Sequence, residues 1–492
     1  MKSYKNTNNW KTLDRDLNRI SILESASTYV SRPMVAPGLA LAFLILAGVV
    51  SIIFFAEGSK NYIVAAAAVM GAYMAINIGA NDVANNMAPA VGANALTMTG
   101  AIAIAALFES MGALLAGGDV VSTISKGIID PSRISDSNAF IWAMMAALIS
   151  AALWVNLATW VGAPVSTTHS VVGGVMGAGI AAAGLTAVNW PTMGKIAASW
   201  VISPVLGGVI AAIFLAIIKS KIIYTDDKIK NARTWVPILI AIMGGAFATY
   251  LAMKGLKKIM EIDFKVAVTI GIVIALLSYL ISKPLIRQQS NNLENKNKSI
   301  KILFRIPLIF SAALLSFAHG ANDVANAIGP LAAIVHTVQF ESVSAKVIIP
   351  FWVMMIGAFG ISFGLFLFGP KLIRRVGSQI TKLNPMRGYC IALSAAITVI
   401  IASWLGLPVS STHIALGAVF GVGFFREWDA ERRKALNLTS GKTKSVGSRE
   451  RHRRKLVRRG HFATILAAWV ITVPCAAVIS AIIYLFLHTL II

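Results

Sequence analysis

Charged residues are scarce in this chain of 492 residues: Asp, Glu, Lys and Arg make up 13% of it, against 57% hydrophobic residues. That is too little charge to cover the surface of a soluble protein of this size. Apolar runs of about 18 residues or more recur along the chain, and each is long enough to cross ~30 Å of hydrocarbon. The runs lack the alternation of β-strands, so the sequence predicts membrane-spanning helices, which satisfy their own backbone groups inside lipid.

Cysteine and acidic residues are also few. Cys390 and Cys475 lie in apolar segments without the spacing of a metal or redox site, and we expect both to be packing residues. The 20 acidic residues face 44 Lys and Arg, which leaves a formal net charge of +24. The basic residues lie in short loops between the apolar spans, as the positive-inside rule describes, so the expected partner is the lipid bilayer and not a nucleic acid.

Internal repetition organises the chain. The segment GANDVANNMAPAVGA starts at Gly79 and returns as GANDVANAIGPLAAI at Gly320, 241 positions later. The segment GAPVSTTHSVVGGVMGAG starts at Gly162 and returns as GLPVSSTHIALGAVFGVG at Gly406, 244 positions later. The order of the two segments is kept, so we expect the chain to hold two homologous halves.

A third pair of segments and the loop charges show how the halves are oriented. Similar pentapeptides surround Trp200 and Trp469 with an offset of 269, and the jump in offset places an insertion at 426–460 in the second half. The loop 117–137 carries three Asp against one Lys and one Arg, whereas its counterpart 369–387 carries five basic residues and no acid. By the positive-inside rule these loops lie on opposite faces, so the halves are inverted repeats, as in many secondary transporters.

The predicted fold is an all-α polytopic membrane protein, with about 12–13 transmembrane segments in two inverted-topology repeats with interrupted or re-entrant helices. Tracing the chain from a cytoplasmic N-terminus leads to an external C-terminus. The expected regions are a cytoplasmic N-terminal tail at 1–36, an extra transmembrane anchor at 37–56, a first inverted repeat at 62–218, central connecting helices and loops at 219–303, and a second inverted repeat at 304–492 with a basic cytoplasmic insertion at 426–460.

The polar centre of the GANDVAN segments is the first candidate site. Asp and Asn at membrane depth are expensive and normally face a cavity or an ion path. Gly before them and Pro after them predict that the chain leaves helical geometry within 79–95 and 319–335, which frees backbone carbonyls as ligands. Carboxylate, amide and carbonyl oxygens together suit a small hard cation. The candidate cation ligands of these segments are Asp82, Asn85, Asp323 and Asn326.

The PVS-T-H segments are the second candidate site. Each follows a Gly and precedes small residues that can form a helix, so each predicts a helix start with free amides and hydroxyls at its positive end. Two such starts that face each other across a pseudo-twofold axis would surround a tetrahedral oxyanion with donors. The candidate donors are Ser166, Thr167, Thr168, Ser410, Ser411 and Thr412.

Three histidines and one glutamate lie in or near these segments. His169 and His413 close the second motif, where substrate orientation, proton sensing and helix capping are open alternatives. His319 faces Ile78 in the repeat alignment, so it is an asymmetric candidate for proton coupling. Glu109 lies within an apolar span, where an ionisable residue is a functional candidate by default, either as a sodium ligand or as the partner of a neighbouring helix.

These motifs resemble those of the PiT family of inorganic phosphate transporters. The resemblance rests on the GANDVAN segments at 79–85 and 320–326 and on the PVS-T-H segments at 164–169 and 408–413. It implies an inverted-repeat helical fold, cation-coupled phosphate uptake and a location in the plasma membrane. It also implies that the Ser and Thr residues of the PVS-T-H segments contact phosphate. The GANDVAN residues that it implicates in binding substrate and cation are Asn81, Asp82, Asn322 and Asp323.

The sequence therefore predicts a secondary active transporter that imports inorganic phosphate by symport with a cation, with sodium favoured, through alternating access. Proton-coupled phosphate transport and transport of sulfate or another oxyanion on the same fold are the alternatives. A channel would need polar rings along a continuous pore, and an enzyme would need a nucleophile, base or metal set that the sequence does not show, so neither is expected. No cofactor is expected beyond the co-transported sodium, and a homodimer would be usual for a transporter of this kind.

Overall fold

Helices account for nearly all of the secondary structure in the computed structural model of this chain. The residues that it describes are 34–55, 60–130, 133–134, 136–161, 165–255, 262–341, 343, 347, 349–379, 384–439 and 459–491. Among these residues, 11 helices are long and apolar enough to cross a membrane, and none of the described residues forms a β-strand. The prediction of an all-α polytopic membrane protein is confirmed.

The two helices that begin at the PVS-T-H motifs are not among these 11 spans, which explains why the count lies below the predicted 12–13. Helix α7 (Thr167–Ala183) has only 17 residues. Helix α15 (Ser411–Thr439) opens on a polar motif and ends in charged residues. Because neither has a long uniform apolar stretch, both depend on the protein around them rather than on lipid contact.

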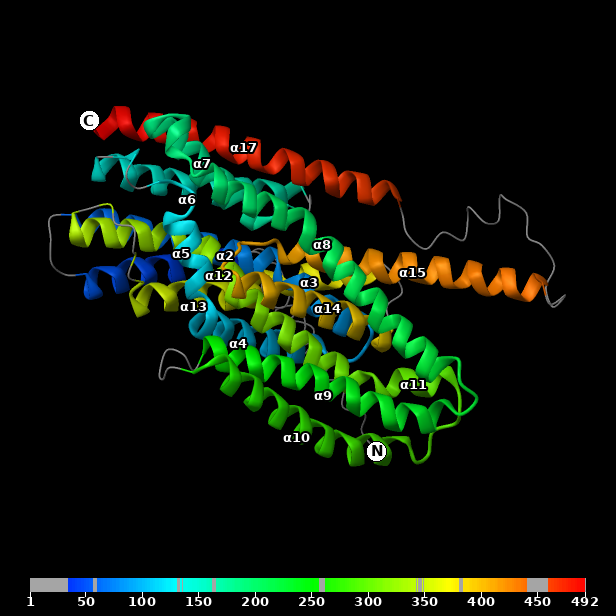
Figure 1. The fold of residues 1–492 in the computed structure, drawn as a ribbon. Coiled ribbons are helices and arrows are strands. Elements are labelled where there is room, and N and C mark those ends of the chain that lie inside the picture. Colours follow the sequence, from blue (N-terminus) through cyan, green and yellow to red (C-terminus); the bar gives the residue numbers. More distant parts are fainter. Residues whose placement is uncertain are drawn as a thin grey trace, which may run out of the picture.

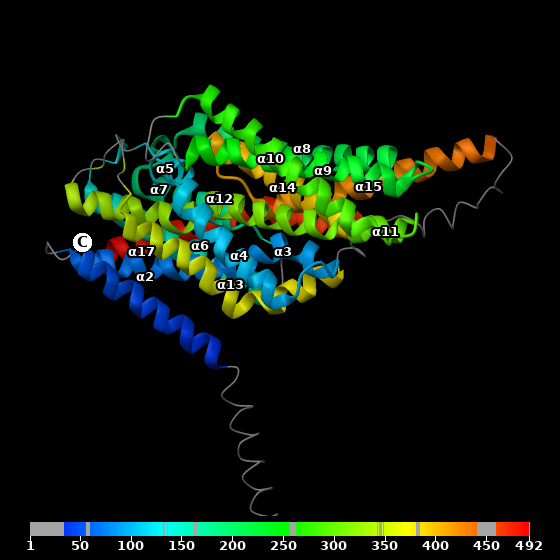
Figure 2. The ribbon, with the colours of Figure 1, turned by 90° about the horizontal axis from the view of Figure 1, so that it is seen from below.

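The N-terminal helix, Met34–Phe54, lies at the edge of the bundle, where 17% of its most apolar stretch is buried (Figure 2). It covers most of the region predicted as an extra anchor. The other helices of the first half are α2 (Asn61–Asn81), α3 (Val83–Gly92), α4 (Met98–Ala116), α5 (Gly118–Lys126), α6 (Ser137–Val161), α7 and α8 (Trp190–Ile218).

The connection between the halves is also helical. A short π-helix (Lys219–Ile223) extends α8. Helices α9 (Lys228–Lys254) and α10 (Phe264–Ser290) pack mainly on each other at one edge of the molecule, and α11 (Asn297–Leu303) follows them (Figure 1). Only 11% of the most apolar stretch of α10 is buried, so this helix presents most of its surface to lipid.

The second half is built around α12 (Arg305–Phe340), whose membrane-spanning stretch is 89% buried. Helices α13 (Phe351–Gln379), α14 (Pro385–Trp404), α15 and α17 (Arg459–Ile491) complete it. Because α15 continues as helix to Thr439, the first part of the basic insertion is helical and not a loop, while residues 440–458 lie outside the described residues.

The two GANDVAN segments differ in backbone geometry. In the first half Asp82 alone separates α2 from α3, and it keeps right-handed helical dihedrals (φ −86°, ψ −33°), so the expected interruption is limited to one residue. In the second half α12 passes through the whole motif without interruption, and Pro330 lies inside it. The predicted departure from helical geometry at 319–335 is therefore wrong. The physical reason is burial: α12 is enclosed by other helices, whose packing outweighs the loss of one N–H donor at a proline.

The two halves interlock through matching helix pairs. Helix α7 of the first half packs on α17 of the second, and α15 of the second half packs on α8 of the first (Figure 1). Glycine allows both close approaches, since a Cβ on Gly177 would clash with the carbonyl of Ala477, and a Cβ on Gly421 with that of Gly208. Small residues at such contacts are the usual means of packing membrane helices. The arrangement brings the starts of α7 and α15 together in the protein interior.

Candidate ion and substrate site

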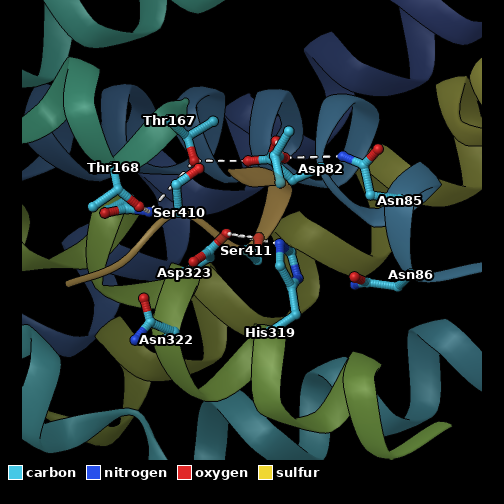
Figure 3. Close-up of polar contacts among 12 residues, drawn as sticks. Asp82, Asn85, Asn86, Thr167, Thr168, His319, Asn322, Asp323, Ser410 and Ser411 are labelled. Carbon is cyan, nitrogen blue, oxygen red and sulfur yellow. Dashed lines mark hydrogen bonds and ion pairs between the residues drawn. The ribbon is translucent and has the colours of Figure 1, made fainter. Parts of the chain in front are cut away.

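Four segments meet at the candidate site: the α2–α3 junction, the middle of α12, and the starts of α7 and α15 (Figure 3). Each of the two helix starts is fixed by a serine cap. The Ser166 Oγ accepts a hydrogen bond from the His169 backbone N–H at 3.2 Å, and the Ser410 Oγ accepts one from the His413 N–H at 3.3 Å. The two serines therefore stabilise the helix starts on which the other hydroxyls stand.

The next hydroxyls of the PVS-T-H motifs donate to the aspartates of the GANDVAN motifs (Figure 3). The Thr167 Oγ1 donates to one oxygen of Asp82 at 2.7 Å, and the Thr412 Oγ1 donates to the other at 2.9 Å. The Ser411 Oγ donates to Asp323 at 3.0 Å. The hydroxyls predicted to bind an anion and the carboxylates predicted to bind a cation are thus direct partners.

The asparagines of the GANDVAN motifs cross between the halves in matching ways. The Asn85 Nδ2 of the first half donates to the Thr412 Oγ1 of the second at 2.9 Å. The Asn326 Nδ2 of the second half donates to the Thr168 Oγ1 of the first at 3.0 Å. Asp82 and Asn85 meet at the same hydroxyl, as their three-residue spacing on one helical face predicts. The predicted pseudo-twofold relation therefore extends to individual hydrogen bonds.

His319 breaks this symmetry. Its Nε2 lies 2.8 Å from the Asp323 Oδ2, and its Nδ1 lies 3.1 Å from the Glu109 Oε2. The other Glu109 oxygen accepts a hydrogen bond from the Asn86 Nδ2 at 2.9 Å. The first half has Ile78 in the place of His319, so only the second aspartate has an imidazole beside it. Glu109 therefore does pair with a neighbouring helix, through His319 of α12.

The site holds three buried carboxylates and one imidazole. Ligand atoms of Asp82, His319 and Asp323 lie within 4.8 Å of one another. No Lys or Arg forms an ion pair with these carboxylates in the part of the chain that the structure describes. The His319 imidazole can offset at most one of the three negative charges, and carboxylates buried together with uncompensated charge are strongly unfavourable. The arrangement is therefore suited to receive positive charge.

Two buried oxygens in the site have neither a hydrogen bond nor an ion pair with any described residue: the Asp323 Oδ1 and the Asn326 Oδ1. Both residues were predicted as sodium ligands. Orphaned buried oxygens from a carboxylate and a carboxamide match the donors that a small hard cation takes. The residues present therefore fit a sodium ion, with Glu109 beside them.

The remaining predicted substrate residues have different surroundings. The amide of Asn322 holds the chain ahead of α15: its Nδ2 donates to the Ser403 Oγ and the Leu407 carbonyl, and its Oδ1 accepts from the Val409 N–H. The side chain of Asn81 makes no hydrogen bond with the described residues and is half-buried. Asn322 therefore faces the peptide before Ser410, and its contact with substrate stays a prediction.

Two tryptophans behind the site, Trp200 and Trp469, were not recognised from the sequence as neighbours of the site, whereas His169 and His413 were. The rings of His169 and His413 lie 4.6 Å apart between centroids, so they connect the starts of α7 and α15 directly. Trp200 lies against His169 at 3.9 Å, and Trp469 against His413 at 3.7 Å. Their equivalent places in the two repeats were the available signal, because two tryptophans at matching positions are expected to face matching partners.

A polytopic helical bundle with buried carboxylates facing two helix starts at the contact of its halves is typical of secondary transporters. Comparison with known families makes the assignment specific. The model described as "Phosphate transporter family" matches residues 78–480, so the chain belongs to that family. It is therefore a transporter and not an enzyme, and a multi-pass membrane protein.

Named relatives and a solved structure agree with this family. A protein of Helicobacter pylori J99, named "Putative phosphate permease", is 53% identical over 84% of this chain and 78% of its own length. A protein of Pyrococcus abyssi with the same description is 38% identical over 85% of this chain and 96% of its own length. The solved structure titled "The sodium-dependent phosphate transporter" is 36% identical, with a TM-score of 0.79 over 88% of this chain and all of that one.

Proposed function

We propose that this protein imports inorganic phosphate across the plasma membrane by symport with sodium, through alternating access. The observation that supports this most directly is the pairing of the two motifs. The carboxylates of Asp82 and Asp323 accept hydrogen bonds from the hydroxyls of Thr167, Thr412 and Ser411. These hydroxyls stand at helix starts that are suited to an anion. The name of the structural neighbour supports sodium as the coupling ion.

Competition for these hydroxyls gives a physical basis for coupling. A phosphate anion needs the same donors, and it is repelled by the negative charge of Asp82 and Asp323 at close range. Sodium on the carboxylate side supplies positive charge and competes with the hydroxyls for the carboxylate oxygens. The hydroxyls can then turn to phosphate. Phosphate binds well only when sodium is present, and that differential affinity is what couples the two fluxes.

The residues divide into two groups in this proposal. Sodium is held by the oxygens of the GANDVAN motifs and of the neighbouring α4, and phosphate by the hydroxyls and amides of the two helix starts, near which Asn81 and Asn322 lie. The proposed sodium ligands are Asp82, Asn85, Glu109, Asp323 and Asn326. The proposed phosphate ligands are Thr167, Thr168, Ser411 and Thr412, with Ser166 and Ser410 as caps.

Alternating access follows from the position of the site between the interlocked halves. The hydrogen bonds from Asn85 to Thr412 and from Asn326 to Thr168 both cross that contact. Rocking of one half against the other would change these bonds and open the site to one face at a time. The loop charges support an N-terminus in the cytoplasm and a C-terminus outside.

Transport by purified protein in liposomes tests the proposal. We expect an inward sodium gradient to drive uptake of labelled phosphate, with little competition from excess sulfate. Asp82→Ala and Asp323→Ala should reduce uptake to background while still inserting into the membrane. Asp226→Ala is the matched control, because that carboxylate is exposed and outside the site.

Each other outcome has a defined meaning. Uptake driven by a proton gradient and not by sodium would show that the coupling ion is the proton. Suppression by sulfate would broaden the substrate to oxyanions. Sodium-driven uptake that persisted in both aspartate variants would contradict the assignment of the site.

A further inference from the structure

Trp200 of α8 touches both of the helix starts to which we assign the anion. Its ring lies against the ring of His169, in the first turn of α7, with centroids 3.9 Å apart. Its indole N–H donates to the carbonyl oxygen of Pro408 at 3.1 Å, two residues before Ser410 and the start of α15. One side chain therefore links the start of α7 to the peptide ahead of α15, and the relative position of these two elements sets the spacing of the proposed phosphate ligands.

The segment Leu407–Val409 needs such support because it lies outside any helix, with Pro408 and Val409 buried and Leu407 half-buried. Polar backbone groups at membrane depth must all find partners. The Leu407 N–H donates to the Ala402 carbonyl, and the amide of Asn322 pairs with the Leu407 carbonyl and the Val409 N–H.

The carbonyl oxygens of Pro408 and Val409 also need hydrogen-bond donors. The Val409 carbonyl accepts from the Thr168 Oγ1 at 3.0 Å, and the Pro408 carbonyl accepts from Trp200. Pro408 has no N–H of its own. Every polar group of the three residues is thus satisfied, and Trp200 supplies the one partner that comes from α8.

Trp469, the repeat mate of Trp200, makes only half of these contacts. Its ring stacks on His413 with centroids 3.7 Å apart, as Trp200 lies on His169. Its indole N–H has no hydrogen-bond partner among the residues that the structure describes. The two tryptophans are therefore alike in ring contact and differ in one hydrogen bond, so the contribution of that bond can be isolated by experiment.

We propose that Trp200 is a positioning residue for phosphate binding, which acts by fixing the peptide ahead of α15 relative to the start of α7. This rests on the proposed function. Loss of the indole N–H leaves the Pro408 carbonyl buried without a partner, and the peptide moves to find one. The hydroxyls of Ser411 and Thr412 then no longer face the donors of α7 at the spacing that one anion requires.

The same substitution at the two tryptophans tests this inference. Trp200→Phe keeps a ring beside His169 and removes the N–H, whereas Trp469→Phe removes an N–H that has no partner. We expect the KM for phosphate to rise about tenfold in Trp200→Phe, the effect of losing one buried hydrogen bond, with kcat within about twofold. Both constants should stay within about twofold of the wild type in Trp469→Phe.

Hydrogen exchange provides a readout that does not depend on transport. Amides of residues 405–413 should exchange at least about tenfold faster in purified Trp200→Phe than in the wild type. Their exchange rates should be unchanged in Trp469→Phe. Equal effects of the two variants, or an unchanged KM in Trp200→Phe, would overturn the positioning role. A wild-type protein that carries no phosphate would instead refute the proposed function, and the exchange measurement would still test whether Trp200 fixes the peptide.

Discussion

Glu109 is the acidic residue of the site without an acidic counterpart in the other repeat. It is fully enclosed, and its two oxygens lie beside Asn86 and His319. Glu109 contacts His319, which also contacts Asp323. Glu109 therefore adds negative charge on the side of the site where Asp323 has an unpartnered oxygen. We therefore expect its carboxylate to raise the affinity of this side of the site for a cation.

Glu109→Gln should weaken sodium binding. The substitution keeps a side-chain carbonyl for Asn86 and removes the charge, so we expect the half-saturating sodium concentration for phosphate uptake to rise about tenfold, or ~1.4 kcal/mol. This sodium concentration is obtained by measuring phosphate uptake at a series of sodium concentrations and at saturating phosphate. Glu294→Gln is the control, since that glutamate is exposed and forms an ion pair with Lys296 on the surface. The same sodium dependence in both variants would exclude Glu109 as a ligand.

At the scale of elements, α8 and α15 are joined far from the site by one aspartate. Asp429 on α15 accepts a hydrogen bond from the Lys219 Nζ at 2.7 Å and another from the Tyr224 hydroxyl, and Arg433 lies 3.5 Å away. The π-helix makes this possible, because its wider turn brings Lys219 and Tyr224 to the same side of the chain. A rigid α15 thus runs from this cluster to Ser411 in the site.

Acid should weaken this junction. Burial raises the pKa of Asp429, but the hydrogen bonds from Lys219 and Tyr224 and the charges of Lys219 and Arg433 outweigh it, so the pKa lies below its ordinary value. A carboxyl whose pKa is lowered by folding stabilises the fold above the unfolded value, about 3.9, and loses that contribution as the pH falls through the folded pKa. Burial, followed by the hydrogen bond to Asp429 and the charge of that carboxylate, raises the pKa of Tyr224 to about 12 against the opposing effect of Arg433, so the phenol stays a donor at neutral pH.

Asp429→Asn should therefore lower the unfolding temperature by about 1–3 °C at pH 7. On acidification to about pH 3, the unfolding temperature of the variant should fall by less than that of the wild type. Thermal unfolding of the detergent-purified protein at the two pH values measures both effects. Asp226→Asn serves as the control because that side chain is exposed. If the difference between the wild type and Asp429→Asn stays constant with pH, the ion cluster does not contribute as argued.

The elements and motifs show where sequence reasoning is strong. Apolar length predicted the spans, and the repeated motifs identified the four segments that meet in Figure 3. Gly and Pro around the motif did not predict the course of α12, because local propensity cannot weigh the packing that encloses it. The contact of His169 with His413 was equally out of reach, since it depends on how the halves dock.

At the scale of the whole molecule, the site exists only where the halves meet. Asp82 of the first half is held by Thr167 of its own half and by Thr412 of the other. Thr168 of the first half receives Asn326 and donates to Val409, both of the second. The proposed cation ligands and the proposed anion ligands are thus interleaved across one contact. Binding on either side therefore changes the energy of the other, and linkage requires the effect to be equal in both directions.

Neutralising both aspartates should uncouple the two ligands. In Asp82→Asn with Asp323→Asn, the carboxamides no longer repel phosphate and bind the hydroxyls less strongly, so phosphate has the donors without help from sodium. We expect phosphate to bind the purified double variant with an affinity that varies less than about twofold between sodium and choline buffers. The wild type should lose at least about tenfold in choline, as measured by calorimetry. The double variant should also fail to concentrate phosphate under a sodium gradient, because binding that ignores sodium cannot be driven by it. Phosphate binding by the double variant that still required sodium would show that the carboxylates do not gate the hydroxyls, and that the coupling ion acts elsewhere in the molecule.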